Sequence, residues 1–305
     1  MVGITSCALA ALMLSNVTSS ALDNARRRDT LEETNKEPIM RALSVIFCLL
    51  AVPATAHEFW IAPLDYQVSP DSKLQANLVN GEGFAGVTIP FLPRGILNAL
   101  QFSGDQTAAI TGRPGDTPAL QMDPIGDGLA ILGYQSAPAS IEYANWEKFQ
   151  AFVDHKDLGN LRAMHDARGL PDAGFTETYM RFSKSLVSVG SGAGADRRVG
   201  LETELVALTN PYTANLADGI AVQLFYRNDP RADAQIEVFA RSPEGEVTTS
   251  YIRTDADGIA RVAVLPAHEY MLDAVLIREP SAVLQDATGA VWQTLWANLT
   301  FAVPQ

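Results

Sequence analysis

Short β-branched and aromatic segments, separated by turn residues, repeat through the last third of the chain and constrain its fold most. Five of them lie between residues 220 and 277: IAVQLFY, AQIEVFA, VTTSYIR, IARVAVL and EYMLDAVLI. In a sixth, TLWANLTFAV, one side holds apolar residues at every second position from Leu295 to Val303. Strands about ten residues apart with turns between them are typical of a β-sandwich. We therefore predict an immunoglobulin-like sandwich for residues 196–305.

The first half of the chain mixes strand and helix signals and does not repeat the second half. The segment KLQANLV (73–79) alternates apolar and polar residues, and residues 85–140 suit short strands joined by long loops. The segment 144–157 carries Trp146, Phe149 and Val153 at helical spacing, and a second short helix is predicted before Gly169 and Pro171. The segment 175–190 is ambiguous, although its end, LVSV, favours a strand.

These signals predict a mostly β protein with two β-sandwich-like domains. The segment GSGAGADRRVG (190–200) is rich in small residues, which is typical of a linker. We therefore predict an N-terminal β domain at 57–195 with a short helical insertion, and a C-terminal sandwich domain at 196–305.

Residues 1–56 read as a leader rather than as part of either domain. Met40 and Arg41 precede the apolar run ALSVIFCLLAVPATA, which ends in an A-x-A motif at Ala56. This is the layout of a secretory signal peptide at 40–56, so the upstream part is interpreted as a mis-called start. Neither apolar run of the leader reaches the roughly 18–20 residues that span a bilayer, and no later segment does. The mature chain is predicted to begin at His57, without a membrane span, in the periplasm or secreted.

Cysteine content and charge exclude several classes of function. Both cysteines, Cys7 and Cys48, fall in the predicted leader, so disulfides, thiolate metal sites and cysteine nucleophiles are excluded from the mature chain. The leader holds five basic and five acidic residues, so residues 57–305 keep the net charge of −13. Phosphate repels a chain this acidic, so no nucleic-acid partner is expected.

An ordered set of motifs resembles one known family. HEFWIAP (57–63), MRFSKSLVSVG, LETELVALTNPY, TDADGIARVAVLPAHEYMLDAV and VWQTLWANLTF occur in this order and cover essentially all of 57–305. Together they resemble the domain-of-unknown-function 4198 family, exported bacterial proteins similar to the periplasmic component of nickel/cobalt uptake systems. The resemblance implies a transthyretin-like C-terminal sandwich, transition-metal handling and a membrane transporter as partner. Many relatives have a glycine shortly before the aromatic residue where this chain has Ala267 and His268.

His57 is the first candidate metal ligand, because cleavage after Ala56 would make it the N-terminal residue. A terminal histidine offers its α-amine and its ring Nδ1 together, and both are available near neutral pH. Such nitrogen donors suit nickel, cobalt, copper or zinc. Glu58 could ligate the ion or orient the imidazole. The alternative is that His57 merely begins a strand, in which Phe59 and Trp60 would point to opposite faces.

His268, predicted to lie in a turn before a strand, is the third candidate ligand; a solvated loop histidine is the alternative. His155 is predicted to be exposed and His165 to be packed on its helix. The segment TDADGIA (254–260) resembles a calcium loop but has Val264 where that pattern needs glutamate, so a hairpin turn is favoured.

No catalytic residue is assigned, because the chain lacks the G-x-S-x-G, H-E-x-x-H, P-loop and G-x-G-x-x-G motifs. Trp292 and Trp296 could form a sugar-stacking platform if exposed, while packing against the other domain is the favoured alternative. Three hypotheses follow. The first is a periplasmic transition-metal-binding protein that uses His57. The second is a non-catalytic carbohydrate- or protein-binding module, and the third is a histidine-brace copper oxidoreductase. A binding protein is favoured over an enzyme.

Overall fold

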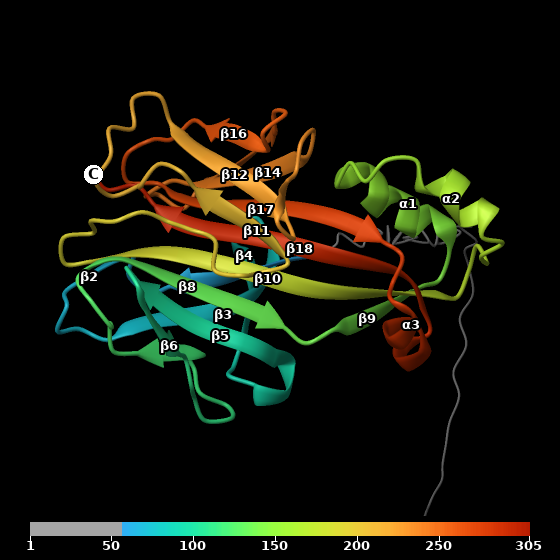
Figure 1. Ribbon diagram of the computed structural model, residues 1–305, viewed down its shortest axis with the longest axis horizontal. Helices are drawn as coiled ribbons and strands as arrows, with labels where there is room; N and C mark the ends of the chain where they lie inside the picture. Colours follow the sequence, from blue (N-terminus) through green and yellow to red (C-terminus); the bar gives the residue numbers. More distant parts are fainter. Residues whose placement is uncertain (1–56) are drawn as a thin grey trace, which may run out of the picture. The chain divides into compact units, whose positions relative to one another are not determined.

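The alternating segments form β-strands in the computed structural model, which describes residues 57–305. The largest sheet has ten strands in the order β15-β14-β17-β18-β10-β8-β5-β6, with β2 and β9 also pairing with β10 (Figure 1). In chain order these strands are β2 (Gln67–Val68), β5 (Ile96–Ser103), β6 (Gln106–Ala109), β8 (Gly128–Ser136), β9 (Ala139–Tyr143), β10 (Phe175–Val189), β14 (Gln235–Arg241), β15 (Val247–Arg253), β17 (Glu269–Arg278) and β18 (Ala290–Ala302).

Two smaller sheets cover opposite faces of the large sheet. One contains β1 (Glu58–Pro63), β3 (Leu74–Glu82), β4 (Ala85–Ile89) and β7 (Leu120–Met122). The other contains β11 (Thr203–Ala207), β12 (Ile220–Tyr226), β13 (Asp229–Pro230) and β16 (Ile259–Val262). Side chains alternate along β8: Leu129 and Ile131 share a core with β11 and β12, whereas Ala130 and Leu132 share one with β1 and β3. The prediction of a mostly β, sandwich-like fold is confirmed.

The large sheet takes strands from both sides of the predicted domain boundary at residue 195. β10 precedes the boundary and β18 follows it, and the two run parallel with their residues in register from Glu177 to Ser185. The ambiguous segment 175–190 is therefore a strand. The division into two domains itself stays a prediction.

The segment 190–200, predicted as a linker, contains no helix or strand but is held to the fold. Asp196 Oδ1 lies 2.7 Å from Lys184 Nζ, and Asp196 Oδ2 accepts a hydrogen bond of 2.8 Å from the backbone N–H of Ala207. Glu204 Oε1 also contacts Lys184 Nζ, at 3.1 Å. These buried contacts fix the connection between β10 and β11 in place.

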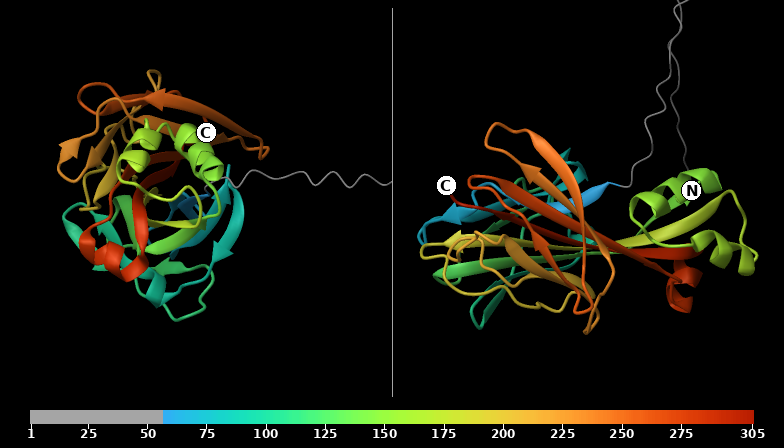
Figure 2. Two further views of the ribbon diagram at one scale, coloured as in Figure 1. Left: turned by 90° about the vertical axis from the view of Figure 1, so that its right-hand side faces the viewer. Right: turned by 90° about the horizontal axis from the view of Figure 1, so that it is seen from above.

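Both predicted helices are present, as α1 (Trp146–His155) and α2 (Leu161–Ala167). They lie at the end of the large sheet opposite to the C-terminus (Figure 1, Figure 2). Phe149 and Phe152 of α1 pack on Trp292 and Trp296 of β18, so both tryptophans are buried. The idea of an exposed sugar-stacking platform is wrong, because the helices cover this side of β18.

Two short helical segments complete the described fold, α3 (Ala282–Thr288) and the 3₁₀ turn η1 (Pro93–Gly95). None of the helices in residues 57–305 has the length and hydropathy that a bilayer crossing requires. The predicted leader at 1–56, with Cys7 and Cys48, lies outside the described residues.

Candidate functional site

Strand β1 has a backbone partner, β3, on one edge only, and side chains of the large sheet complete its other edge. Three carbonyl oxygens along this edge accept hydrogen bonds from side chains of β10 and β18. His57, just before β1, accepts from Arg181 Nη2 (2.7 Å), Phe59 from Ser183 Oγ (3.0 Å) and Ile61 from Thr300 Oγ1 (2.7 Å). Buried carbonyl groups are costly when left unpaired. These three bonds therefore fix the position of β1 and of His57 at its start.

His57 and Glu58 point to opposite sides of this extended segment, as successive residues of a strand do. The side chain of His57 is exposed and lines a cavity. The side chain of Glu58 is buried and reaches Lys156 on the other side. Phe59 and Trp60 are both buried, in two different cores. This alternation prevents His57 and Glu58 from facing a common point.

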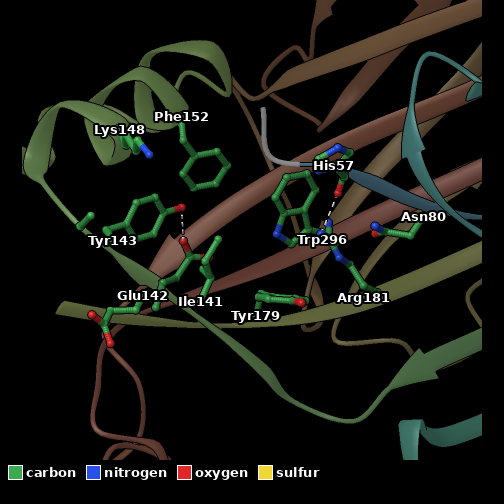
Figure 3. Close-up of a pocket in the computed structure, with 12 residues that line it drawn as sticks. His57, Asn80, Ile141, Glu142, Tyr143, Lys148, Phe152, Tyr179, Arg181 and Trp296 are labelled. Atoms are coloured by element: carbon green, nitrogen blue, oxygen red, sulfur yellow. Dashed lines mark hydrogen bonds between the residues drawn. The ribbon is translucent and has the colours of Figure 1, made fainter. Parts of the chain in front are cut away.

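The cavity beside His57, called the His57 cavity below, has a volume of about 320 Å³. It lies between α1, β9, β10 and β18, with His57 at one end (Figure 3). Its lining residues are His57, Asn80, Ile141, Glu142, Tyr143, Ala144, Lys148, Phe152, Glu177, Tyr179, Arg181 and Trp296. Four aromatic and two aliphatic side chains form apolar walls, and four charged side chains stand among them. That composition is typical of a small-ligand site.

Glu177 is the buried acid of the cavity. Its carboxylate accepts hydrogen bonds from the hydroxyl of Tyr143, at 2.9 Å, and from the hydroxyl of Thr294. Burial raises the pKa of Glu177 to about 7, because a carboxylate loses its hydration there. Glu177 is thus able to gain or lose a proton near neutral pH.

Arg181 is the buried cation of the cavity. Its guanidinium lies 3.9 Å from the ring centroid of Trp296 and 5.0 Å from that of Tyr179, which are cation–π distances. Nη2 donates to the carbonyl of His57, whereas Nη1 has no hydrogen-bond partner among the described residues. One arginine therefore holds the start of β1 and keeps a further donor unused.

A second charged group, called the Lys156 cluster below, lies on the Glu58 side of β1. Lys156 Nζ contacts Glu58 Oε1 at 2.9 Å, Glu237 Oε2 at 2.6 Å and Asp273 Oδ2 at 3.3 Å. All four side chains are almost completely buried. The ammonium group is the shared counter-ion of three carboxylates that would otherwise repel one another.

The pKa values of these carboxyl groups diverge. Burial raises the pKa of Glu58 to about 7, opposed by Lys156, and burial also raises the pKa of Asp273. Burial acts in the same direction on Glu237, but the hydrogen bond from His155 and the charge and hydrogen bond of Lys156 together lower its pKa to about 2. Glu237 therefore stays ionised near neutral pH, whereas the pKa of Glu58 lies close to neutral pH.

The Lys156 cluster belongs to a row of polar side chains across the face of the large sheet. Five cross-strand neighbours form the row: Tyr251, Glu237, Asp273, Asn298 and Ser183. β1 packs over β10 and β18, so Ser183 and Asn298 of this row are buried, whereas Tyr251 at its other end is exposed. Both amide atoms of Asn298 lack a hydrogen-bond partner in the described part of the chain.

Glu58, Glu237 and Asp273 are the one group of three or more potential metal-ligating side chains within residues 57–305. Their ligand atoms lie within 4.8 Å of one another. Lys156 Nζ already contacts all three carboxylates, however, and so takes the place that a cation would need. A metal ion there would have to displace a buried ammonium group.

The structure does not bring the three predicted ligands together. His57 lines the cavity, Glu58 belongs to the Lys156 cluster, and His268 lies just before β17, five residues along the chain from Asp273. Five strand residues span roughly 16 Å. His268 is half-buried, and its Nδ1 lies 2.8 Å from the carbonyl oxygen of Pro266.

The two remaining histidines are also held elsewhere. His165 is buried as predicted: its Nδ1 accepts a hydrogen bond from Trp292 Nε1 (3.1 Å), and its Nε2 donates to the carbonyl of Pro171 (3.0 Å). His155 is partly exposed, and its Nε2 contacts Glu237 Oε1 at 3.2 Å. The pKa of His155 is raised by this hydrogen bond with Glu237. Neither histidine lines the His57 cavity.

Asp255 organises a hairpin turn, as the sequence predicts. Its Oδ1 accepts hydrogen bonds from the backbone N–H groups of Asp257 and Ile259, both at 2.9 Å. Gly258 has a φ of 72°, a left-handed conformation that favours glycine. The segment is thus built as a turn, with the carboxylate of Asp255 committed to the backbone.

Sequence patterns did not single out Arg181, Glu177, Tyr143 or Lys156. Arg181 carried a usable signal, since it stands between the apolar residues Met180 and Phe182 in a strand segment, and charged residues are seldom buried without a partner. Lys156 carried none, because its three carboxylate partners come from β1, β14 and β17. Only the tertiary structure assembles that cluster.

The comparisons with known proteins show the family and little beyond it. No curated protein matches the sequence significantly. Among solved structures, the crystal structure of a tetra-tandem repeat in the extending region of a large adhesion protein matches with a TM-score of 0.19 and 10% identity, over 81% of this chain and 49% of that chain. This chain spans about half the length of that structure, and a TM-score this low carries no argument.

The family comparison agrees with the ordered motifs. The family model described as Domain of unknown function (DUF4198) matches residues 54–278, from just before His57 to the end of β17. This range covers most of the chain and nearly all residues of the His57 cavity. The chain therefore belongs to the DUF4198 family.

Proposed function

We propose that this protein is an exported transition-metal-binding protein in which the N-terminal histidine created by cleavage after Ala56 is the primary ligand. The ion is nickel, cobalt, copper or zinc, as cargo of an uptake or homeostasis system. Export to the periplasm and delivery to a membrane transporter are parts of the proposal and stay predictions.

One observation carries the proposal: His57 is exposed at one end of a cavity while its backbone is held in place. The bond from Arg181 Nη2 engages the carbonyl oxygen of His57 only. None of the residues 57–305 makes a hydrogen bond to the imidazole ring of His57. A processed terminus would therefore present its α-amine and Nδ1 for chelation from a fixed backbone, and both are donors that suit these metals.

The other candidate ligands support the proposal less. Glu58 is bound by Lys156, and His268 lies outside the His57 cavity. A histidine brace needs a second histidine beside the first, and none of His155, His165 and His268 lines the cavity. The copper oxidoreductase hypothesis therefore has less support than a binding protein. The non-catalytic adhesion hypothesis would remain if the terminus bound no metal.

The test compares two forms of the processed protein. The full chain is exported through its own leader, and the product that begins with His57 is confirmed by intact mass. A second form carries one additional alanine before His57, which moves the α-amine out of chelating range while retaining the ring. Isothermal titration with Ni²⁺, Co²⁺, Cu²⁺ and Zn²⁺ should show one site in the first form and at least a tenfold weaker one in the second.

Two controls separate the terminus from other donors. His268→Ala removes a histidine outside the cavity and should leave the metal affinity unchanged. His57→Ala should weaken binding as much as the additional alanine does. Equal affinity of the native and extended forms, or no binding by either, would refute the proposed function.

A further inference from the structure

Apart from His57, the uncharged and acidic side chains that line the His57 cavity offer a transition-metal ion oxygen donors only. A terminal histidine supplies two nitrogens, and these ions take at least four ligands. Among the other lining residues the oxygen donors are the amide of Asn80, the hydroxyls of Tyr143 and Tyr179, and the carboxylates of Glu142 and Glu177. Glu177 is committed to two hydroxyl donors, and Glu142 points away from His57 (Figure 3).

The cavity is also much larger than a single ion. Its volume of about 320 Å³ falls in the range of small-molecule sites. Tyr143, Phe152, Tyr179 and Trp296 supply apolar walls, and the cations Lys148 and Arg181 stand among them. This space suits an organic ligand that reaches from the metal at His57 toward α1.

Arg181 indicates the charge of that ligand. It is more than nine-tenths buried, and its Nη1 has no partner among residues 57–305. Its Nη2 is bonded to the carbonyl of His57, so the unused donor lies on the same guanidinium that holds the terminus. A carboxylate is the group that a guanidinium binds best, through parallel N–H donors.

The surrounding charges make a free carboxylate a poor ligand on its own. Arg181 also interacts electrostatically with Asp273, Glu177 and Glu58, and these acids would repel an added anion. A divalent metal at His57 compensates the charge of the carboxylate. Metal and carboxylate should therefore bind cooperatively, each providing the opposite charge that the other needs.

We propose that the His57 cavity binds its metal as a complex with a small organic carboxylate, which ligates the ion and pairs with Arg181. The inference rests on the proposed function, because it takes the metal to be held by the terminal histidine. The cargo is then a metal chelate, with the metal at His57 and the organic ligand against the aromatic walls.

The experiment measures ternary complexes of the processed protein. Native mass spectrometry and isothermal titration are carried out with Ni²⁺ alone, with citrate, malate or glycine alone, and with each carboxylate and Ni²⁺ together. Ethylenediamine serves as a chelator without a negative charge. We expect a protein–nickel–carboxylate species with at least one carboxylate, and at least a tenfold gain in the affinity for that carboxylate when Ni²⁺ is present. Ethylenediamine should give no such gain.

Two arginine variants test the assigned contact. Arg181→Lys should lose the ternary species, because the ammonium group has no second planar donor. Arg231→Lys is the matched control: Arg231 is partly buried, with Nη2 bonded to the carbonyl of Val275 (2.8 Å) and Nη1 unpartnered among residues 57–305, but it lies outside the cavity. The control should form the ternary species as the wild type does.

The outcomes separate the two proposals. Nickel binding that depends on the native terminus, without a ternary species for any carboxylate, would overturn the inference and retain the proposed function. An equal gain with ethylenediamine, or an undiminished ternary species in Arg181→Lys, would also overturn the inference. No nickel binding by the native terminus, with or without a carboxylate, would overturn both.

Discussion

Arg181 Nη2 donates a hydrogen bond of 2.7 Å to the carbonyl oxygen of His57, across 124 positions of sequence. The bond connects the largest sheet to the residue that follows the predicted cleavage site. Within residues 57–305 it is the side-chain hydrogen bond that His57 receives, and it engages the backbone carbonyl rather than the ring. The start of the mature chain is thereby held without using its ligand atoms.

Lys156→Met should destabilise the protein strongly. The substitution removes the shared counter-ion of Glu58, Glu237 and Asp273, and an uncompensated buried charge costs about 3–5 kcal/mol. The free energy of unfolding from urea titration at pH 7 measures the loss. Lys73→Met is the control, since its pair with Asp123 is exposed and should cost under about 1 kcal/mol.

A compensated variant tests the cause of that loss. Adding Glu58→Gln and Asp273→Asn to Lys156→Met removes two of the uncompensated charges and should recover a large share of the stability. A Lys156→Met protein as stable as the wild type would contradict the assignment of Lys156 as the counter-ion.

Stability should fall as the pH rises from about 4.5 to 7, in part because of Glu177. The folded protein raises the pKa of this carboxyl group from 4.5 to about 7, so in that window the folded state binds the proton more tightly than the unfolded state. Proton release with rising pH therefore favours unfolding, and the contribution of Glu177 is roughly 3 kcal/mol at most.

Glu177→Gln should flatten that pH dependence. Glutamine retains an oxygen that accepts from Tyr143 but does not ionise. Unfolding free energies at pH 5, 6, 7 and 8 should fall less steeply in Glu177→Gln than in the wild type. Glu142→Gln, an exposed position of the same cavity, should keep the wild-type slope. Identical slopes in all three proteins would show that Glu177 does not titrate in this range.

Ala267→Gly should stabilise the turn before β17. Ala267 has a φ of 59°, a left-handed conformation that costs an L-residue with a Cβ roughly 1–2 kcal/mol. Glycine adopts it without that cost, so the net gain after its larger chain entropy is about 0.5–1 kcal/mol. A rise in Tm measures the gain. Ala85→Gly, on exposed strand β4, should lower Tm instead.

Thr300→Val should loosen β1 selectively. Valine has nearly the same shape as threonine but cannot donate to the carbonyl of Ile61, and an unpaired buried carbonyl costs about 1–3 kcal/mol. Hydrogen exchange of the amides in β1 should accelerate more than that in β12. Thr248→Val, on exposed strand β15, should change neither. Uniform acceleration in all strands would argue against a local role of Thr300.

The alternating segments after residue 219 predicted their strands well. Apolar and polar residues alternate within each segment, and this alternation alone identifies the face of the strand that packs in a core. The helices α1 and α2 were predicted for the same reason, from a period near 3.6 and from Gly169 and Pro171 beyond the second helix. β10 was harder, because Arg181 and Lys184 interrupt its apolar pattern. Arg181 finds its partner 124 positions away, and Lys184 pairs with Asp196 and Glu204 beyond the end of the strand. The periodicity of the strand itself gives no sign of these partners.

For the candidate site, the sequence by itself singled out His57, through the A-x-A motif before it and the scarcity of other metal ligands. Its role as a ligand stays a prediction. The tertiary structure alone decided that Glu58 and His268 lie away from it, and that Arg181, Glu177 and Trp296 surround its cavity. The physical reason is the same for each residue. β1 and α1 pack on one side of the large sheet, and the side chain of His57 meets side chains of β3, β9, α1, β10 and β18 where those surfaces join.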